Sequence, residues 1–227
     1  MKALVLLSGG MDSTIATYWA KGKFEEVETI GFDYMQRHLE AEMNASHCIA
    51  SLARVKHVRF NLGVLYQMGD SALFKHCEDS VSSEHRVGGL PASFVPGRNI
   101  LFLTVAAIYA YKIGASHLIG GMCQTDYSGY PDCRAEFIDY MQAALTKGLD
   151  YPITIETPFM YMTKAEEVRM ARDLPSCMQA LSFSHTCYEG QYPPCGKCPA
   201  CLLRAKGFQE AGVSDPLIDR ARREGVL

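Results

Sequence analysis

The residues best suited to chemistry stand close to the start of the chain, between Ser8 and Ser13. Two adjacent glycines, two hydroxyl side chains and a carboxylate follow a short apolar stretch and precede residues of helical pattern. Glycines at a strand-to-helix junction let the backbone approach a phosphate, and the dipole of the following helix favours negative charge there. The segment therefore predicts a pyrophosphate cradle, and hence nucleotide chemistry.

This cradle differs from the Walker A motif, because no lysine follows the glycines and Asp12 brings a negative charge close to the phosphates. A carboxylate at this point can bind a Mg²⁺ carried by the nucleotide. The alternative is an ordinary glycine turn in which Asp12 or Ser13 caps the helix. We expect eight consecutive residues to hold the nucleotide: Leu7, Ser8, Gly9, Gly10, Met11, Asp12, Ser13 and Thr14.

A second chemical signal lies near the C-terminus, where four of the nine cysteines cluster. Four thiolates can close a tetrahedron around Zn²⁺ with no open position, which is typical of a structural site. An iron–sulfur cluster and free buried thiols are the alternatives, and zinc is favoured. We interpret His185 as a neighbour of this site rather than a ligand. The predicted ligands are Cys187, Cys195, Cys198 and Cys201.

Three further polar clusters, at 33–37, 121–134 and 156–164, follow predicted strands. Ligands bind beyond the carboxyl ends of parallel strands, so these clusters and the cradle are expected to face one crevice. Aromatic rings stack on flat heterocycles and arginine binds carboxylates through two hydrogen bonds, so these clusters could bind a substrate. The alternative is that they are solvated loops whose tyrosines only pack against the protein. The predicted substrate-binding residues are Tyr34, Gln36, Arg37, Phe94, Asn99, Asp126, Tyr127, Tyr130, Asp132 and Arg134.

The sequence offers no nucleophile–base pair and no Gly-x-Ser-x-Gly elbow, so covalent hydrolase chemistry has little support. Catalysis is expected to rest on positioning and on neutralising charge. Lys164 and Arg98 are predicted to act on the phosphates, together with Asp12 and Ser13 of the cradle. Lys164 follows Thr163, which opens a helix with a capping-box pattern. Asn99 as a helix cap and Arg98 as its solvated neighbour are the alternative there.

The elements that must position these residues alternate between strand and helix. Strands are predicted at 2–7, 27–32, 55–60, 117–120 and 153–156, with helices at 13–20, 39–54, 100–111 and 135–147 and from 163. The helix at 100–111 is apolar nearly all round and is expected to be buried. The pattern predicts an α/β domain, residues 1–186, with helices on both faces of a parallel sheet. Residues 187–227 are predicted to form a zinc-binding helical cap.

Composition narrows the class of protein further. The chain has 227 residues, 48% of them hydrophobic, and a net charge of −3, which favours small-molecule substrates over a nucleic-acid backbone. The longest apolar run is too short to cross a bilayer, and nothing at the start resembles an export signal. We therefore expect a cytoplasmic protein with no membrane partner.

These motifs together resemble the PP-loop ATP-pyrophosphatase superfamily and, within it, the 7-cyano-7-deazaguanine synthase family of the queuosine pathway. The resemblance rests on residues 8–13, 32–38, 94–99, 125–134, 156–158 and 163–166 and on the four cysteines. The family tends to have glycine where Met35 stands. The resemblance implies a Rossmann-like, adenine-nucleotide alpha hydrolase-like fold, with ATP, Mg²⁺ and Zn²⁺ bound.

The resemblance also implies a reaction, in which 7-carboxy-7-deazaguanine, ammonia and ATP give the nitrile 7-cyano-7-deazaguanine through adenylated carboxylate and amide intermediates. It implies free ammonia as the nitrogen source and a homodimer. Two other hypotheses are a PP-loop enzyme that thiolates tRNA or forms another amide, and a nucleic-acid-binding zinc module on a degenerate nucleotide fold. The net charge of −3 argues against the tRNA enzyme, and the intact Ser8, Asp12 and Ser13 argue against the module.

Overall fold

The computed structural model describes residues 1–74, 89–125 and 129–227. Its centre is a parallel sheet of five strands: β1 (Lys2–Leu6), β2 (Glu26–Asp33), β3 (Lys56–Asn61), β4 (His117–Ile119) and β5 (Thr154–Glu156). The strand order is β3-β2-β1-β4-β5, so the chain reverses direction across the sheet between β3 and β4. The predicted parallel sheet is confirmed.

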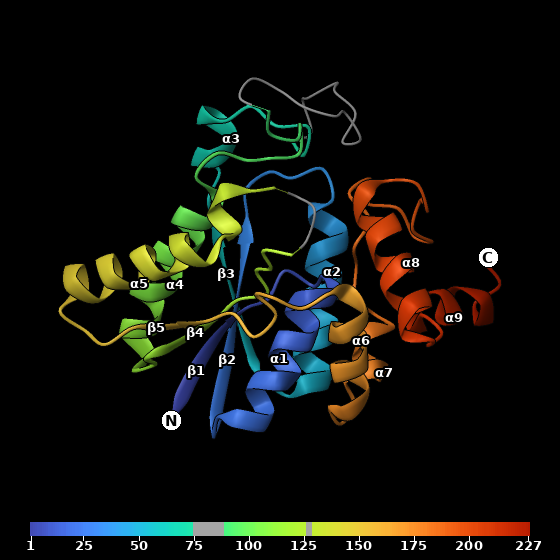
Figure 1. Ribbon diagram of the computed structural model, residues 1–227, viewed down its shortest axis with the longest axis horizontal. Helices are drawn as coiled ribbons and strands as arrows, with labels where there is room; N and C mark the ends of the chain where they lie inside the picture. The colour runs from blue at the N-terminus through green and yellow to red at the C-terminus, as the bar shows by residue number, and fades with distance from the viewer. Residues whose placement is uncertain (75–88, 126–128) are drawn as a thin grey trace.

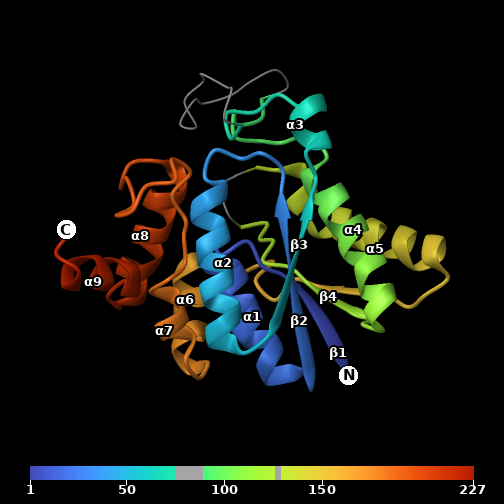
Figure 2. The ribbon, with the colours of Figure 1, turned by 180° about the vertical axis from the view of Figure 1, so that it is seen from behind.

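Helices cover both faces of this sheet (Figures 1 and 2). One face packs against α1 (Met11–Lys23), α2 (Leu39–Ala53), α6 (Lys164–Asp173) and α7 (Cys177–Leu181). The other face packs against α4 (Arg98–Ile113) and α5 (Ala135–Leu149). The sequence analysis did not predict the short helix α3 (Val64–Met68) or the 3-10 turn Pro131–Cys133. Elements this short carry no periodic signal.

The sheet topology fixes where a ligand can bind. β1 pairs with β2 on one side and with β4 on the other, and Val5 is level with Ile119. The segments that leave β1 and β4 therefore start side by side at the carboxyl edge. The helix that follows β1, α1, covers one face of the sheet, and the helix that follows β4, α5, covers the other. Ligands of open α/β sheets bind at such a switch point.

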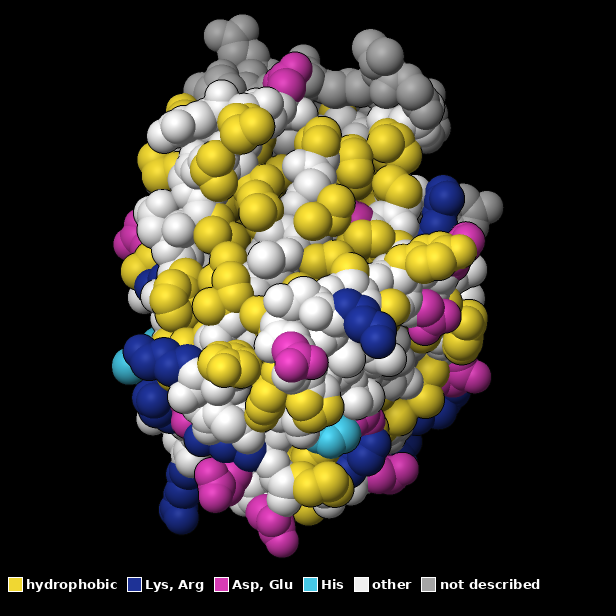
Figure 3. Space-filling model, turned by 90° about the vertical axis from the view of Figure 1, so that its left-hand side faces the viewer, with side chains coloured by type: hydrophobic (Ala, Val, Ile, Leu, Met, Phe, Trp, Pro, Cys, Tyr) yellow, Lys and Arg dark blue, Asp and Glu magenta, His cyan; other side chains and the backbone are white. Residues whose placement is uncertain are grey.

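The helix α4 departs from its sequence-based expectation. Its inner side is buried at Leu103, Ala106 and Ala110, but Ile100, Ile108 and Tyr111 are about half exposed. A helix that covers a sheet buries only one stripe, so the apolar residues on the opposite side remain uncovered. Figure 3 shows hydrophobic side chains gathered on this side of the molecule. The expectation of a helix buried nearly all round is therefore wrong.

The C-terminal part holds α8 (Pro199–Ala211) and α9 (Pro216–Arg223), which lie beyond α6 and α7 (Figure 1). The buried Arg204 of α8 joins Asp215 at 2.7 Å and donates to the Ser184 hydroxyl at 2.8 Å. A β-carbon on Gly207 would lie 2.6 Å from Lys164 Cβ, so α8 packs directly on the first residue of α6. No helix in the described part of the chain is long and apolar enough to span a membrane.

Candidate active site

The segment Ser8–Thr14, here called the PP-loop, joins β1 to α1. The helix begins at Met11, and Gly10 precedes it without a side-chain cap, so Asp12 lies inside the first turn and is not the cap. The Ser8 and Ser13 hydroxyl oxygens lie 3.1 Å apart, and the Gly10 N–H donates to Ser8 Oγ at 3.2 Å. The first turn of α1 therefore offers its N–H groups to an anion rather than to a cap.

Gly9 holds the PP-loop against α2. Its φ of +91° lies in a region that residues with a β-carbon avoid, and a β-carbon there would lie 2.8 Å from both Ala45 Cβ and Ser46 N. Only glycine allows both the turn and this approach. The loop geometry thus depends on packing against a helix some 35 positions further along the chain, as the residue numbers show.

Lys164, the first residue of α6, contacts the PP-loop although about 150 residues separate them in the sequence. The predicted capping box is confirmed, since the Glu166 N–H donates to Thr163 Oγ1 at 3.3 Å and the Thr163 N–H donates to Glu166 Oε2 at 2.8 Å. This cap starts α6 at Lys164, whose Nζ lies 2.8 Å from Asp12 Oδ2. Two residues predicted to act together are therefore in direct contact.

Glu167, which the sequence analysis did not select, is the second carboxylate at Lys164. Its Oε1 lies 2.8 Å from Lys164 Nζ, and its side chain is completely buried. A carboxylate so far from water is stabilised by the ammonium group next to it. The spacing of three residues on one helix was the only sequence signal for this pair.

Arg98 stands in a cluster of tyrosines on the other side of the site. Its guanidinium lies 5.6 Å from the centre of the Tyr130 ring, and it hydrogen-bonds to Tyr34. Burial lowers the pKa of Arg98, but Tyr34, Tyr130, Cys133 and the Asp132 carboxylate together outweigh this effect and raise it. Burial also raises the pKa of Tyr34. Within the described residues no carboxylate forms an ion pair with Arg98. The group is thus a charged donor available to an anionic ligand.

Other predicted substrate residues fix this cluster in place. The Asn99 backbone N–H donates to Asp132 Oδ2 at 3.1 Å and its side-chain amide donates to the Asp132 carbonyl at 3.0 Å, so Asn99 is not a cap for α4. Phe94 packs on Tyr130, with 5.5 Å between ring centres. Arg134 is exposed where α5 begins. Asp126 and Tyr127 lie outside the described residues.

The loop after β2 carries the remaining predicted residues. Gln36 is fully buried, and its amide accepts from the Tyr34 N–H at 3.0 Å and donates to Glu42 at 2.6 Å. Arg37 pairs with Glu189 at 3.3 Å. Met35 has a φ of +65°, a conformation that suits the glycine expected there. Gln36 therefore faces the interior and supports Tyr34, while Arg37 faces the C-terminal part.

The four predicted ligands at the C-terminal end come together, all sulfur atoms lying within 4.8 Å of one another. Tetrahedral zinc with Zn–S bonds of about 2.3 Å requires sulfurs about 3.8 Å apart. The Cys195 and Cys201 sulfurs are 3.9 Å apart, and hydrogen bonds from the Cys198 and Cys201 thiols lower the pKa of Cys187. Soft donors at this spacing fit a structural zinc ion.

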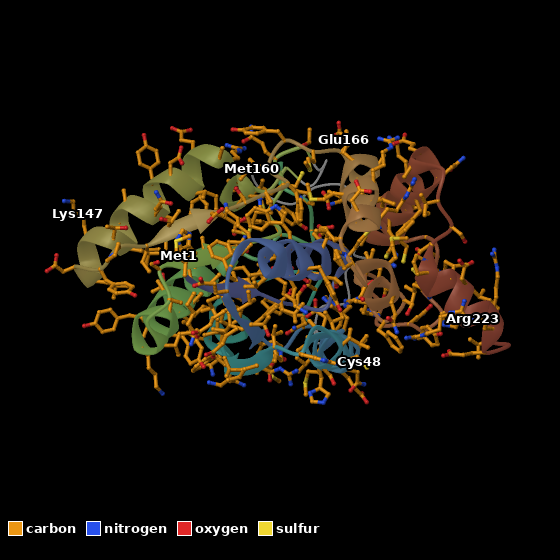
Figure 4. The ribbon with its side chains drawn as sticks, turned by 90° about the horizontal axis from the view of Figure 1, so that it is seen from below. Met1, Cys48, Lys147, Met160, Glu166 and Arg223 are labelled. Atoms are coloured by element: carbon orange, nitrogen blue, oxygen red, sulfur yellow. The ribbon has the colours of Figure 1, made fainter. Side chains whose placement is uncertain are left out.

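A cavity of about 540 Å³ opens near α5 and the segment 155–166. Figure 4 shows Met160 and Glu166, two of its lining residues, on the same side of the molecule. Part of the predicted cluster 156–164 lines it, but none of the individually predicted binding or catalytic residues does, and its charged lining groups are the carboxylates Asp139 and Glu166. Such a lining disfavours a polyphosphate, so this cavity is a poorer candidate for the nucleotide than the PP-loop.

Comparisons with known proteins agree with this geometry. A family described as "Queuosine biosynthesis protein QueC" matches residues 2–212. A 7-cyano-7-deazaguanine synthase of Chromobacterium violaceum is 47% identical over 98% of this chain and 95% of its own length. Those of Laribacter hongkongensis and Bacillus subtilis are 45% and 43% identical, over 96% and 92% of this chain and 94% of each relative.

Two solved structures share the fold at low identity. A 4-thiouridine synthetase–RNA complex with bound ATP has a TM-score of 0.51 and 14% identity, covering 99% of this chain and 53% of that one. A predicted tRNA methyltransferase subunit of Methanocaldococcus jannaschii has a TM-score of 0.50 and 18% identity, covering 76% and 74%. The family match spans nearly the whole chain, and the curated relatives agree with it: the chain belongs to the QueC family of queuosine biosynthesis proteins.

Proposed function

We propose that this chain converts 7-carboxy-7-deazaguanine, ammonia and ATP into 7-cyano-7-deazaguanine. The observation that carries the proposal is the PP-loop, in which an uncapped helix start and two hydroxyls lie beside the Asp12–Lys164 pair. Relatives named for this product match 92–98% of the chain in three organisms. The reaction is therefore that of an ATP-dependent ligase forming carbon–nitrogen bonds.

The chemistry requires two activations, because both carboxylate oxygens must leave. A carboxylate oxygen attacks the α-phosphorus of ATP and expels pyrophosphate, and ammonia then displaces AMP to give the amide. The amide oxygen attacks a second ATP, again expelling pyrophosphate. The nitrogen of the O-adenylated amide loses one proton to give a neutral imidate, and loss of its second proton with departure of AMP leaves the nitrile. In each round the PP-loop N–H groups and Lys164 stabilise the pyrophosphate that departs.

The two cations of the site take different ligands in this proposal. Lys164 touches the PP-loop carboxylate, so it serves the phosphates. Arg98 lies among Tyr34 and Tyr130 instead, so we assign it to the carboxylate of the base rather than to the phosphates. Tyr34 and Tyr130 are themselves buried, and in this proposal they hold the Arg98 guanidinium in position beside the base.

Two metals belong to the proposal. Asp12 would hold the Mg²⁺ that accompanies ATP, because a carboxylate oxygen beside the phosphate cradle is a suitable ligand. That ion would neutralise phosphate charge. Zinc at the four cysteines would supply no catalytic step, since a closed four-sulfur shell has no position for substrate. The division into a nucleotide-binding domain, 1–186, and a zinc-binding cap, 187–227, is part of the same proposal.

We also propose that two copies associate through the outer side of α4. Ile100, Ile108 and Tyr111 form an exposed apolar stripe there. In a dimer with two-fold symmetry, this stripe of one copy would pack against the same stripe of the other. Replacing Ile108 with aspartate would then yield a monomer in sedimentation, whereas a wild-type monomer would contradict the proposal. No disulfide joins any of the described cysteines, and a cytoplasmic location is part of the proposal.

A product assay tests the proposed function. Purified protein, ATP, Mg²⁺, ammonia and 7-carboxy-7-deazaguanine are incubated and the bases are analysed by mass spectrometry. The proposal predicts the nitrile, with two AMP formed for each molecule of product. Formation of AMP without nitrile or amide, or transfer of sulfur to tRNA instead, would contradict it.

A further inference from the structure

The segment His185–Gly190, here called the cap segment, connects α7 to the cysteine cluster and contacts the PP-loop. The His185 backbone N–H donates to the Gly9 carbonyl at 2.7 Å. Its ring Nε2 lies 2.7 Å from the Cys187 carbonyl, which can only accept, so Nε2 donates. One residue therefore ties a metal ligand to the turn of the PP-loop.

The cap segment is also fixed to the loop after β2. Glu189 pairs with Arg37 at 3.3 Å, and both side chains are partly buried. The His38 and Tyr188 rings pack with 5.8 Å between their centres, and a β-carbon placed on Gly190 would lie 3.4 Å from His38 Cα. These contacts hold Tyr188 between the cysteine cluster and the loop after β2, which are far apart in the sequence.

Tyr188 lies between the cysteine cluster and the tyrosines around Arg98. Its backbone N–H donates to Cys198 Sγ, and its ring packs in the hydrophobic cluster that contains Tyr34. Arg98, Tyr34 and Tyr130 are close enough to Tyr188 to interact with it electrostatically. Its hydroxyl has no hydrogen-bond partner within the described residues, and the side chain is only half-buried.

We propose that Tyr188 binds the deazaguanine base, with its ring against the flat heterocycle and its hydroxyl available as a donor. The sequence analysis missed this residue because it assigned the whole cysteine region to a structural role. The proposal rests on the proposed function, since that function supplies the base. It adds a wall of the base pocket that metal binding at Cys187 and Cys198 holds in place.

The test compares Tyr188→Leu and Tyr188→Phe with Tyr192→Leu, a matched change at an exposed tyrosine of the cap whose hydroxyl contacts Arg220 and Glu224. Calorimetry gives separate Kd values for 7-carboxy-7-deazaguanine and for ATP, and zinc content is measured for each protein. Tyr188→Leu should weaken base binding by roughly 5- to 100-fold, as loss of one stacking aromatic does. Tyr188→Phe should keep base binding within about threefold, and ATP binding and zinc content should not change.

Nitration of the wild-type chain by tetranitromethane supplies a readout that needs no variant. The carboxy base should slow nitration of Tyr188 and leave Tyr192 unaffected, as measured by peptide mass spectrometry. Unchanged base binding by Tyr188→Leu, or equal nitration with and without the base, would overturn the inference alone. Loss of zinc and ATP binding along with base binding would also overturn it. A wild-type chain that binds ATP but not the base would overturn the proposed function as well.

Discussion

The two halves of the proposed site, one for the phosphates and one for the base, are assembled in different ways. The phosphate half comes mainly from one continuous segment, Ser8–Thr14, at the junction of β1 and α1, to which α6 adds Lys164. The base half draws Tyr34, Arg98, Tyr130 and Tyr188 from four separate segments. A continuous junction keeps its geometry through local hydrogen bonds, whereas the base half depends on how distant elements pack. Substitutions in the two halves should therefore differ in their effects on activity and on the KM of each substrate.

The largest effect is expected at the phosphate half. Lys164→Met removes the cation next to the PP-loop, and kcat/KM should fall about 10²–10³-fold, as for other charge-stabilising groups. Steady-state kinetics on both substrates measures it. Lys147→Met at the exposed end of α5 is the control, and an equal loss there would remove the distinction (Figure 4).

Removal of zinc should affect both halves at once, because the cap segment joins Cys187 to Gly9 and to the loop after β2. For Cys195→Ala we expect a loss of about 3 kcal/mol, seen as a Tm lower by roughly 6–12 °C. The KM values for ATP and for the base should both rise. Calorimetric melting and elemental analysis check this. The matched variant is Cys48→Ala, an exposed cysteine outside the cluster, and an equal Tm loss in both would refute a role for the metal.

A smaller and more selective effect is expected in the base half. Arg98→Lys keeps the charge but loses the planar fork that matches a carboxylate. The KM for 7-carboxy-7-deazaguanine should rise roughly 10- to 30-fold while the KM for ATP stays within about twofold. Arg222→Lys, exposed on α9, serves as the control. If the KM for ATP rises instead, Arg98 acts on the phosphates and the division between the halves is wrong.

The smallest effect concerns the shape of the PP-loop. Gly9→Ala forces a β-carbon against Ala45 and Ser46 at positive φ, and we expect about 1–2 kcal/mol of lost stability with a raised KM for ATP. Gly22→Ala on α1, where nothing lies within 4 Å of the added carbon, should instead stabilise by up to about 1 kcal/mol. Denaturant unfolding of both variants decides the matter, and equal free energies would mean that the loop is not packed as described.

The same difference explains what the sequence could predict. The alternation of elements, the strand-to-helix junction at Ser8–Thr14 and the capping box of Thr163 are local patterns, and each was predicted and found. The exposed side of α4 was not predicted, because composition alone does not say which apolar stripe faces the sheet. Glu167, His185 and Tyr188 gain their contacts only when α6 and the cap segment reach the PP-loop. Gln36 looked like a ligand by its type, but packing turned it inward.

Oxygen transfer tests the central claim most directly, namely that the site adenylates both oxygens of the carboxylate. The base is supplied with ¹⁸O in both carboxylate positions, and the nucleotides and pyrophosphate are analysed by mass spectrometry. The account predicts one ¹⁸O in each of the two AMP molecules formed per nitrile and none in pyrophosphate. Label in pyrophosphate or inorganic phosphate, or unlabelled AMP beside labelled water, would contradict it.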